Sequence, residues 1–199
     1  MSALFERLSR LFEEGHCVTL ADLRSDAGFA PRDVRPAAVL IAVTDRAEPG
    51  VLLTHRPEGL RAHPGQVAFP GGKLDPGEDA ITAALRETHE ELGINISDIK
   101  VIGPTDSFMT ATGYDVTPVL GLIPPDLPIK PNPHEVAAWF EAPLAFLLDP
   151  ANHIEKMTEF GGRARPYLEI EWQGHRIWGV TAAIIANLSR RIAWERADG

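Results

Sequence analysis

The stretch Leu52–Ile94 decides the fold and reads LLTHRPEGLRAHPGQVAFPGGKLDPGEDAITAALRETHEELGI. Its second half predicts a helix over residues 79–92, because the strong helix formers Ala, Leu and Glu dominate there. A turn signal at Pro76-Gly77 precedes this segment, and Gly93 stands where a helix should end. We therefore expect a glycine-rich loop that leads into one regular helix.

Three glutamates of this helix share one face. Glu87, Glu90 and Glu91 are three and four residues apart or adjacent, a spacing that places side chains beside one another. At ~4 Å and an effective dielectric constant of ~20, a like-charge pair costs up to about 4 kcal/mol. A plain acidic face would spread these charges into water, whereas a Mg²⁺ ion, which prefers oxygen ligands, would relieve the repulsion. Arg86 adjoins the cluster and can orient a glutamate through a bidentate pair.

A second stripe of the same helix is mainly apolar and should pack on the core. Its members recur at helical spacing and are Ile81, Leu85, Thr88 and Leu92. Thr88 is the polar member, and we expect its hydroxyl to donate to the carbonyl one turn earlier.

The spacing of the charged and glycine residues resembles the Nudix box, G-x5-E-x7-R-E-U-x-E-E-x-G-U, in which U is usually a bulky aliphatic residue. Every charged and glycine position of the box is present, at Gly72, Glu78, Arg86, Glu87, Glu90, Glu91 and Gly93. Thr88 departs from the pattern, and this change affects packing beneath the helix rather than the metal face. So many fixed positions make this a specific signal.

The resemblance implies a role for each matching residue. It implies metal ligands at Glu87, Glu90, Glu91 and the Gly71 carbonyl, an outer position at Glu78, and a bracing arginine at Arg86. The family hydrolyses a nucleoside diphosphate linked to another moiety, with Mg²⁺ or Mn²⁺ as the cofactor. In this chemistry a carboxylate takes a proton from water while the metal polarises phosphoryl oxygens. Glu90, Glu91 and Glu135 all remain candidates for the catalytic base.

The first half of the stretch gathers positive charge. Arg56, Arg61, His63 and Lys73 lie close together in a chain whose formal net charge is -9. Such a local departure from overall acidity favours an anionic ligand, and arginine is a usual phosphate binder. Phe69 could stack on a base, although a core position is the commoner place for such a ring.

This first half, LLTHRPEGLRAHPGQVAFPGG, resembles the segment found upstream of the Nudix box in coenzyme A pyrophosphatases, roughly LLT-x-R…L-R-x-H-x-G-Q-V-A-FPGG. Residues 57–59 depart from the small polar residues usual there. The resemblance implies that Arg56, Arg61 and His63 contact phosphate or adenosine, with Phe69 as a further candidate. Similar segments at 112–128 and 178–185 extend the resemblance over about residues 36–192.

Two other readings stay open. The same chemistry could act on ADP-ribose, NADH, a dinucleoside polyphosphate or an oxidised nucleotide, and the metal glutamates do not separate these substrates. A non-catalytic domain that senses a nucleotide is the alternative from a different class. Such domains often lose glutamates of the box, whereas Glu87, Glu90 and Glu91 are present here.

Composition narrows the class of protein. The 199 residues, 44% hydrophobic and 24% charged, fit one domain with a sizeable core. Acidity argues against general nucleic-acid binding. Cys17 is the single cysteine, which fits a reducing compartment such as the cytoplasm. The N-terminus lacks the apolar core of a signal peptide, and no run of about 18 apolar residues predicts a membrane span. A monomer and a homodimer are equally open.

Periodicity predicts an α/β protein, an α/β/α sandwich around a mixed β-sheet, which is the Nudix fold. We expect helices at 2–14, 79–92, 143–148 and 181–193, and strands at 37–44, 51–54, 99–103, 115–123, 135–141, 165–172 and 175–178. Gln173-Gly174 should form a hairpin turn. We divide the chain into an N-terminal helix and lead-in (1–35), the Nudix domain (36–193) and a tail (194–199). The proline-rich loops at 124–126 and 130–134 either flank a substrate cleft or simply connect strands.

Overall fold

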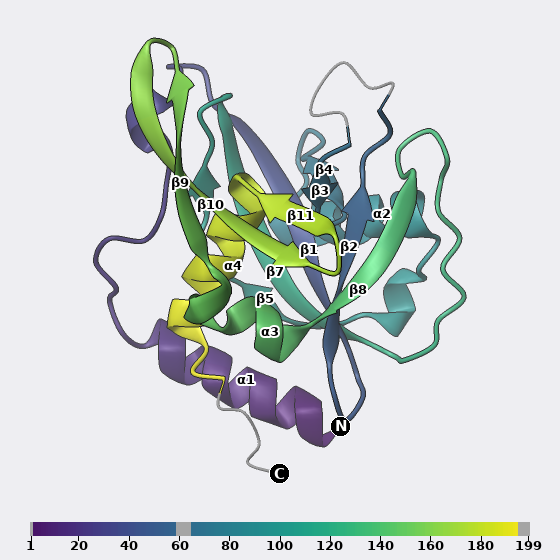
Figure 1. Cartoon of the computed structure of the whole chain (residues 1–199). Coiled ribbons are helices and arrows are strands. Elements are labelled where there is room, and N and C mark those ends of the chain that lie inside the picture. The colour runs from purple at the N-terminus through teal and green to yellow at the C-terminus, as the bar shows by residue number, and fades with distance from the viewer. Residues whose placement is uncertain (1, 59–64, 195–199) are drawn as a thin grey trace.

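The computed structural model describes residues 2–58 and 65–194 (Figure 1). The helices are α1 (Ala3–His16), α2 (Ala80–Leu92), α3 (Leu144–Leu148) and α4 (Val180–Arg191), with 3-10 turns at Ala27–Phe29, Ile96–Asp98 and Pro150–Asn152. The strands are β1 (Arg35–Thr44), β2 (Gly50–His55), β3 (Val67–Ala68), β4 (Gly71–Lys73), β5 (Lys100–Pro104), β6 (Phe108–Met109), β7 (Tyr114–Ile123), β8 (Ala138–Pro143), β9 (Ile154–Phe160), β10 (Arg163–Trp172) and β11 (His175–Trp178).

Within the described residues, eight strands form one mixed sheet in the order β3-β2-β1-β7-β5, with β4 on β1, β6 on β7 and β8 on β2. The long central pair β1 and β7 is parallel, and Arg35 lies opposite Tyr114. β1 and β2, both predicted as strands, form an antiparallel hairpin in which Val43 lies opposite Val51. Short β4 pairs with the start of β1, so the loop that precedes α2 is tied to the sheet at Val39 and Gly71.

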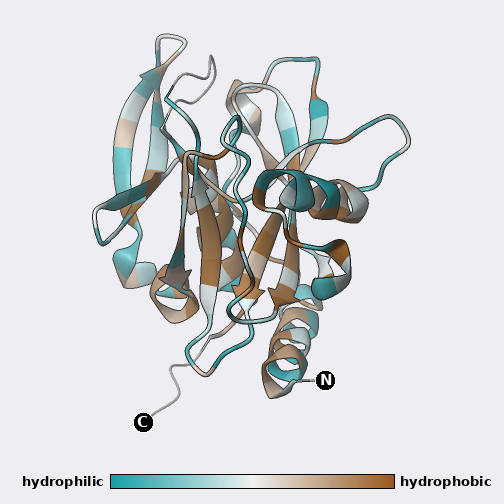
Figure 2. Cartoon of the chain, turned by 90° about the vertical axis from the view of Figure 1, so that its right-hand side faces the viewer, coloured by the Kyte–Doolittle hydropathy of each residue, from teal (hydrophilic) through white to brown (hydrophobic). Residues whose placement is uncertain are grey.

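Alternation along β1 and β2 divides the core into two layers. Ala38, Leu40 and Leu52 pack under α2, on what we call the α2 face of the sheet. Ile41 and Leu53 point the opposite way, toward α3 and α4, on the α4 face. Figure 1 shows α2 and α4 on opposite sides of the sheet, and the central strands carry the strongest hydrophobic colour in Figure 2. The α/β sandwich around a mixed sheet is confirmed.

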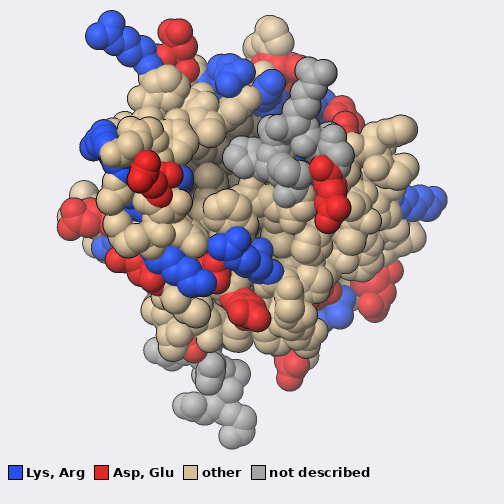
Figure 3. All heavy atoms as spheres, turned by 45° about the horizontal axis from the view of Figure 1, so that its top comes forward, with Lys and Arg blue, Asp and Glu red and all other residues tan. Residues whose placement is uncertain are grey.

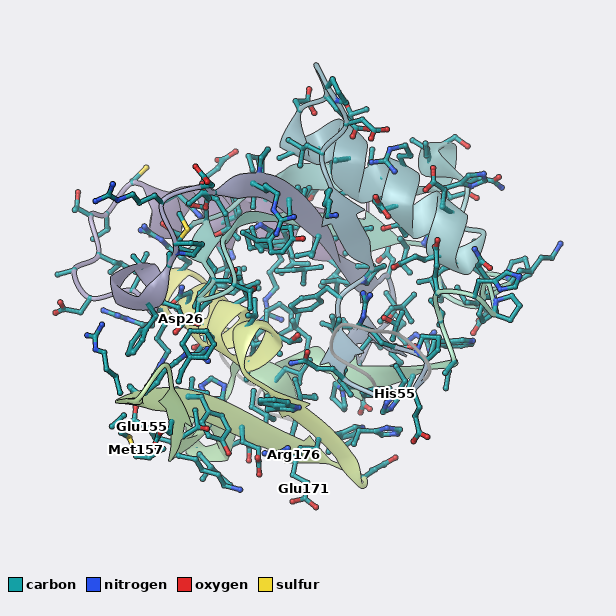
Figure 4. The ribbon with its side chains drawn as sticks, turned by 90° about the horizontal axis from the view of Figure 1, so that it is seen from above. Asp26, His55, Glu155, Met157, Glu171 and Arg176 are labelled. Carbon is teal, nitrogen blue, oxygen red and sulfur yellow. The ribbon has the colours of Figure 1, made fainter. Side chains whose placement is uncertain are left out.

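A second, three-stranded antiparallel sheet in the order β11-β10-β9 covers part of the α4 face. The β10–β11 hairpin turns at Gln173 and Gly174, whose φ angles are 46° and 83°, as the sequence predicts. Seen from above, this small sheet lies on the far side of α4 from β1, and Glu171 and Arg176 lie on its outer side (Figure 4). β9 is exposed along its whole length and has no counterpart among the predicted strands.

The predicted helices are all present, with ends shifted by one or two residues. One strand boundary is wrong: the strand expected at 135–141 is β8, which begins at Ala138. The cause is local, because the N–H groups of Glu135 and Val136 both donate to the Asn132 carbonyl and form a turn there. Glu135 therefore lies in a loop at the head of β8.

α1 covers the lower end of the core (Figure 1). Its Leu8 is fully buried and belongs to the cluster that includes α4. The guanidinium of Arg191, at the end of α4, donates to the Gly15 carbonyl at 2.8 Å and to Asp106 at 2.7 Å. The N-terminal helix thus packs on the same core as the strands that follow it.

Candidate active site

The glutamate helix α2 begins and ends as its sequence predicts. The Asp79 side chain accepts from the Thr82 N–H at 2.8 Å, and Gly93 closes the helix in the left-handed conformation at φ 68°. Thr88 is fully buried, and its hydroxyl donates to the Ala84 carbonyl at 2.7 Å. The apolar side of α2 is thus fixed against the sheet, and Figure 2 shows its hydrophilic side turned outward.

Arg86 connects the charged residues of the loop and the helix. Its guanidinium makes a bidentate pair with Glu78, in which both bonds are 2.9 Å long. Nη1 also donates to Glu87 at 2.9 Å and to Glu90 at 3.2 Å, and Nη2 donates to the Lys73 carbonyl at 3.1 Å. The Glu78 pair keeps the pKa of that carboxyl below its ordinary value. Arg86 therefore braces the helix against the preceding loop.

The glycines before the helix let backbone and carboxylates approach closely. The Gly71 N–H donates to the Glu91 carboxylate at 3.1 Å. At Gly72, an added Cβ would lie 2.7 Å from one carboxylate oxygen of Glu87. A side chain at position 72 would therefore displace Glu87. Strand β4 thus brings Gly71 and Gly72 directly against two of the candidate metal ligands.

Burial leaves the negative charge of this cluster poorly compensated. Glu91 is only 7% exposed, and burial raises its pKa to about 8. The Gly71 N–H and the charge of Arg56 lower that pKa, while the carboxylates of Glu87 and Glu135 raise it. Burial also raises the pKa of Glu87, against the stabilising bond from Arg86. The carboxylate of Glu135 is therefore close enough to raise the pKa of both Glu87 and Glu91.

The donor set suits a hard divalent cation, because it consists of carboxylate oxygens whose negative charge Arg86 and the Gly71 N–H offset only in part. The side chains are not already gathered into a coordination shell: among the described residues, no group of three or more His, Cys, Asp or Glu is placed to hold a metal ion. Arg86 Nη1 donates to both Glu87 and Glu90, so a cation bound there would share these carboxylates with arginine.

The basic residues predicted upstream are only partly described. Arg56 directly follows β2. Its Nε atom is buried without a hydrogen-bond partner among the described residues, and its charge acts on Glu91. Arg61 and His63 lie outside the described residues. Phe69 is 4% exposed and packs in the core on the α4 face, so its ring offers no surface for stacking a base. This burial corrects its placement among the substrate contacts.

Two contacts of the site have no sequence signal of their own. The Lys73 carbonyl accepts from Arg86, and the Asp75 N–H donates to Glu78 at 2.9 Å. Both depend on how the loop 73–78 folds back on α2, which spacing alone does not reveal.

Two hollows flank this glutamate cluster rather than coincide with it. One, of about 320 Å³, lies between the lead-in and β10 and contains the Asp26–Arg165 ion pair. The other, of about 240 Å³, lies beside β8. Figure 3 shows basic and acidic side chains interspersed on the upper face. Within the described residues, no helix is long and apolar enough to cross a membrane.

Comparison with known proteins places this geometry in a family. The family model described as NUDIX domain matches residues 34–160. The uncharacterized Nudix hydrolase NudL of Shigella flexneri serotype 5b is 44% identical over 172 residues, covering 85% of this chain and 89% of that protein. The NudL protein of Escherichia coli K12 is 46% identical over 160 residues, covering 79% and 83%. A solved Ap4A hydrolase from C. elegans aligns over 55% of this chain and 80% of its own, with 24% identity and a TM-score of 0.48.

Proposed function

The chain belongs to the Nudix family, and on that premise we propose that it hydrolyses the pyrophosphate bond of coenzyme A or its thioesters. The products would be 3′,5′-ADP and 4′-phosphopantetheine or its acyl form. Membership of the family indicates a hydrolase that acts on pyrophosphate bonds. The identity of the substrate, coenzyme A, is what we propose. We expect it to act on this small molecule in the cytoplasm, as a monomer or a homodimer.

One juxtaposition carries the proposal. A buried carboxylate with a raised pKa, Glu91, lies within electrostatic reach of an arginine, Arg56, whose Nε has no partner. Buried polar groups normally have partners, so a buried arginine Nε that has none among the described residues, beside a carboxylate cluster, supports an anionic ligand here. A pyrophosphate with divalent cations would satisfy both sides, because its oxygens accept from arginine and its metal binds the carboxylates.

We assign the metal to Glu87, Glu90 and Glu91, with the Gly71 carbonyl as a further ligand. Hydrolases of this family need divalent cations, and Mg²⁺ or Mn²⁺ fits a set of oxygen donors. When bound, such an ion would neutralise phosphoryl oxygens and lower the pKa of water. Arg86 holds the carboxylates of Glu78, Glu87 and Glu90 in position by donating hydrogen bonds to each of them.

The chain itself supplies a proton acceptor. Water forms a new bond to one phosphorus, the bridging P–O bond breaks, and a carboxylate takes the proton that the water loses. Glu90, Glu91 and Glu135 are the proposed acceptors, and Glu135 reaches the site from the loop before β8. Glutamine variants at each of the three positions rank these candidates, because replacing the true base should lower kcat the most.

The choice of coenzyme A rests on the segment upstream of α2. Of the three residues that the resemblance assigns to phosphate or adenosine, Arg56 is described, and its charge acts on Glu91. Arg61 and His63 continue the resemblance to coenzyme A pyrophosphatases in the sequence. We expect Arg56→Ala to raise KM for coenzyme A, because it removes a phosphate partner. Arg24→Ala is a matched control, since Arg24 pairs with Glu155 on the small sheet.

The test is direct. Purified protein is incubated with coenzyme A and Mg²⁺ or Mn²⁺, and the products are separated by chromatography and identified by mass. ADP-ribose, NADH, diadenosine polyphosphate and an oxidised nucleotide are compared at equal concentration. The proposal predicts 3′,5′-ADP as the main product and the highest kcat/KM for coenzyme A.

Cleavage of ADP-ribose or a nucleotide without release of 3′,5′-ADP overturns the coenzyme A assignment. Tight binding of these ligands without turnover of any would support the nucleotide-sensing alternative instead. A chelator and Glu91→Gln serve as controls that should abolish turnover.

A further inference from the structure

The hollow beside β8 has an apolar interior and a charged rim. It measures about 240 Å³ and lies on the α2 face, next to the proline-rich loop 124–129. Leu52 and Ile123 come from the sheet, and Leu127 and Ile129 come from the loop. Such a hollow accepts a flat or aliphatic group, with polar contacts available at its mouth.

Trp139 stands at the edge of this hollow. The residue lies on β8, opposite Thr54 of β2, and is 41% exposed. Among the described residues, β8 pairs only with β2 and so forms an edge of the sheet. A half-exposed indole beside an apolar hollow offers a surface on which an aromatic ring can stack.

The rim offers an acceptor and a donor side by side. Thr44 donates to Glu141 at 2.6 Å, and an added Cβ at Gly50 would lie 2.7 Å from the carboxylate carbon of Glu141. Glu141 is thereby held in one place. Arg46 Nη2 lies 3.4 Å from Glu141 and 3.7 Å from Asp126, both partly hydrated pairs. Both Glu141 and Arg46 can therefore make further bonds to a ligand.

The hollow and the glutamate cluster lie along the same two elements. Leu52 lines the hollow from β2, Trp139 lies opposite Thr54 of the same strand, and Arg56 follows Thr54 by two residues, a span of about 7 Å in an extended chain. The loop before β8 also touches both places, because Ile129 lines the hollow while the Asn132 N–H donates to the Glu91 carbonyl at 2.8 Å. The hollow is thus connected to the proposed pyrophosphate position along β2 and through the loop before β8.

We propose that this hollow binds the adenine base of the substrate, stacked on Trp139. An exocyclic amine would donate to Glu141, and the neighbouring ring nitrogen would accept from Arg46. Adenine presents that donor and acceptor on one edge, whereas hypoxanthine replaces the amine with an oxygen. The inference deepens the proposed function and rests on it for the link to catalysis, but binding of the base can be measured without turnover.

The experiment measures binding of AMP and IMP by calorimetry, in the wild type and in Trp139→Ala, Trp139→Phe and Arg46→Ala. Stacking of a base on an aromatic side chain predicts that Trp139→Ala weakens AMP binding roughly 5- to 150-fold. Trp139→Phe should retain most of the affinity, and Arg46→Ala should weaken AMP binding. IMP should bind more weakly than AMP to the wild type. Met157→Ala, an exposed apolar residue on the small sheet, is the matched control and should change nothing.

The same variants are assayed with coenzyme A, where Trp139→Ala should raise KM and leave kcat nearly unchanged. Unchanged AMP affinity in Trp139→Ala, with an unaltered melting temperature, overturns the inference even if coenzyme A is hydrolysed. Equal affinities for AMP and IMP overturn the assignment of the amine to Glu141. Loss of AMP binding in Trp139→Ala without any hydrolysis of coenzyme A supports this site while the proposed substrate fails.

Discussion

Two buried glutamates of this protein meet opposite surroundings. Glu169, on the small sheet, is 6% exposed and accepts from both Lys156 and Arg176. These bonds lower its pKa, chiefly through Lys156. Glu91, on α2, is 7% exposed and accepts from a backbone N–H, while burial raises its pKa to about 8. One carboxylate is neutralised by the fold and the other is not.

On our proposal, this difference separates a structural carboxylate, Glu169, from one that binds a metal ion, Glu91. A buried charge that lacks a counter-ion destabilises the fold by several kcal/mol unless it is protonated or paired. Glu169 avoids that cost with two cations of its own chain. Glu91 can avoid the cost of a buried charge by taking up a proton or by binding a metal ion. Metal binding is the role that we propose for it in a Nudix hydrolase.

The largest expected effect follows from removing the charge of Glu91. Glu91→Gln keeps the shape and can still accept from the Gly71 N–H, but its neutral amide is a weaker metal ligand than a carboxylate and cannot act as a base. We expect kcat to fall by about 10²- to 10⁴-fold with the fold preserved. Glu169→Gln is the matched control and should leave kcat/KM unchanged. Steady-state kinetics of both variants, with circular dichroism spectra, check this, and an active Glu91→Gln would contradict the assigned role.

A smaller effect is expected from Gly72→Ala. The new Cβ would occupy space held by the Glu87 carboxylate and push it from its bond with Arg86. We expect activity to fall about 10- to 100-fold, as for other changes that misplace a metal ligand. Gly77→Ala is a useful comparison, because nothing lies within 4 Å of a Cβ there, although its φ of 85° is itself strained for alanine. Equal losses of activity in both variants would assign the effect to loop strain instead.

Glu169→Gln should reduce stability rather than activity. Loss of its charge-assisted bonds predicts a decrease of about 1–3 kcal/mol in the free energy of unfolding at pH 7. The folded pKa of Glu169 lies below the ordinary glutamate value of about 4.3. Its contribution is therefore complete above that value and disappears as pH falls through the folded pKa. In urea titrations of both proteins, the difference in free energy of unfolding should shrink as the pH is lowered below the ordinary glutamate pKa, and a difference that does not change with pH would refute this origin.

The smallest effect is expected at the exposed Arg24–Glu155 pair. Arg24 and Glu155 are 37% and 58% exposed, so solvent screens their 2.8 Å contact. Arg24→Ala should cost less than about 1 kcal/mol, a shift of a few degrees at most in a chain of this length. Differential scanning calorimetry measures the shift. A larger loss would show that the small sheet depends on its contact with the lead-in.

Much of the glutamate site could be predicted because its information is local. Asp79 and Gly93 bound the helix, and Thr88 donates to the carbonyl one turn back, since all these contacts join residues within five positions. The β1–β2 hairpin and the Gln173-Gly174 turn follow for the same reason. The roles of the glutamates remain predictions that only activity can test.

What could not be predicted depends on distant partners. β4 has three residues and exists because it pairs with β1, and β9 is an exposed strand that pairs with β10. Phe69 lies close to the site in sequence, yet the fold turns it into the core. The hollow beside Trp139 joins residues from β1, β2, β8 and the loop 124–129, which no local spacing brings together.

The most direct test of the central claim is a Mn²⁺ titration of the wild type, Glu91→Gln and Glu169→Gln, followed by electron paramagnetic resonance of the free ion. The contrast between the two glutamates predicts that Glu91→Gln weakens Mn²⁺ binding about 10- to 100-fold. Glu169→Gln should bind Mn²⁺ as the wild type does. Equal affinities in all three proteins would contradict the claim that the uncompensated charge on α2 is the metal site.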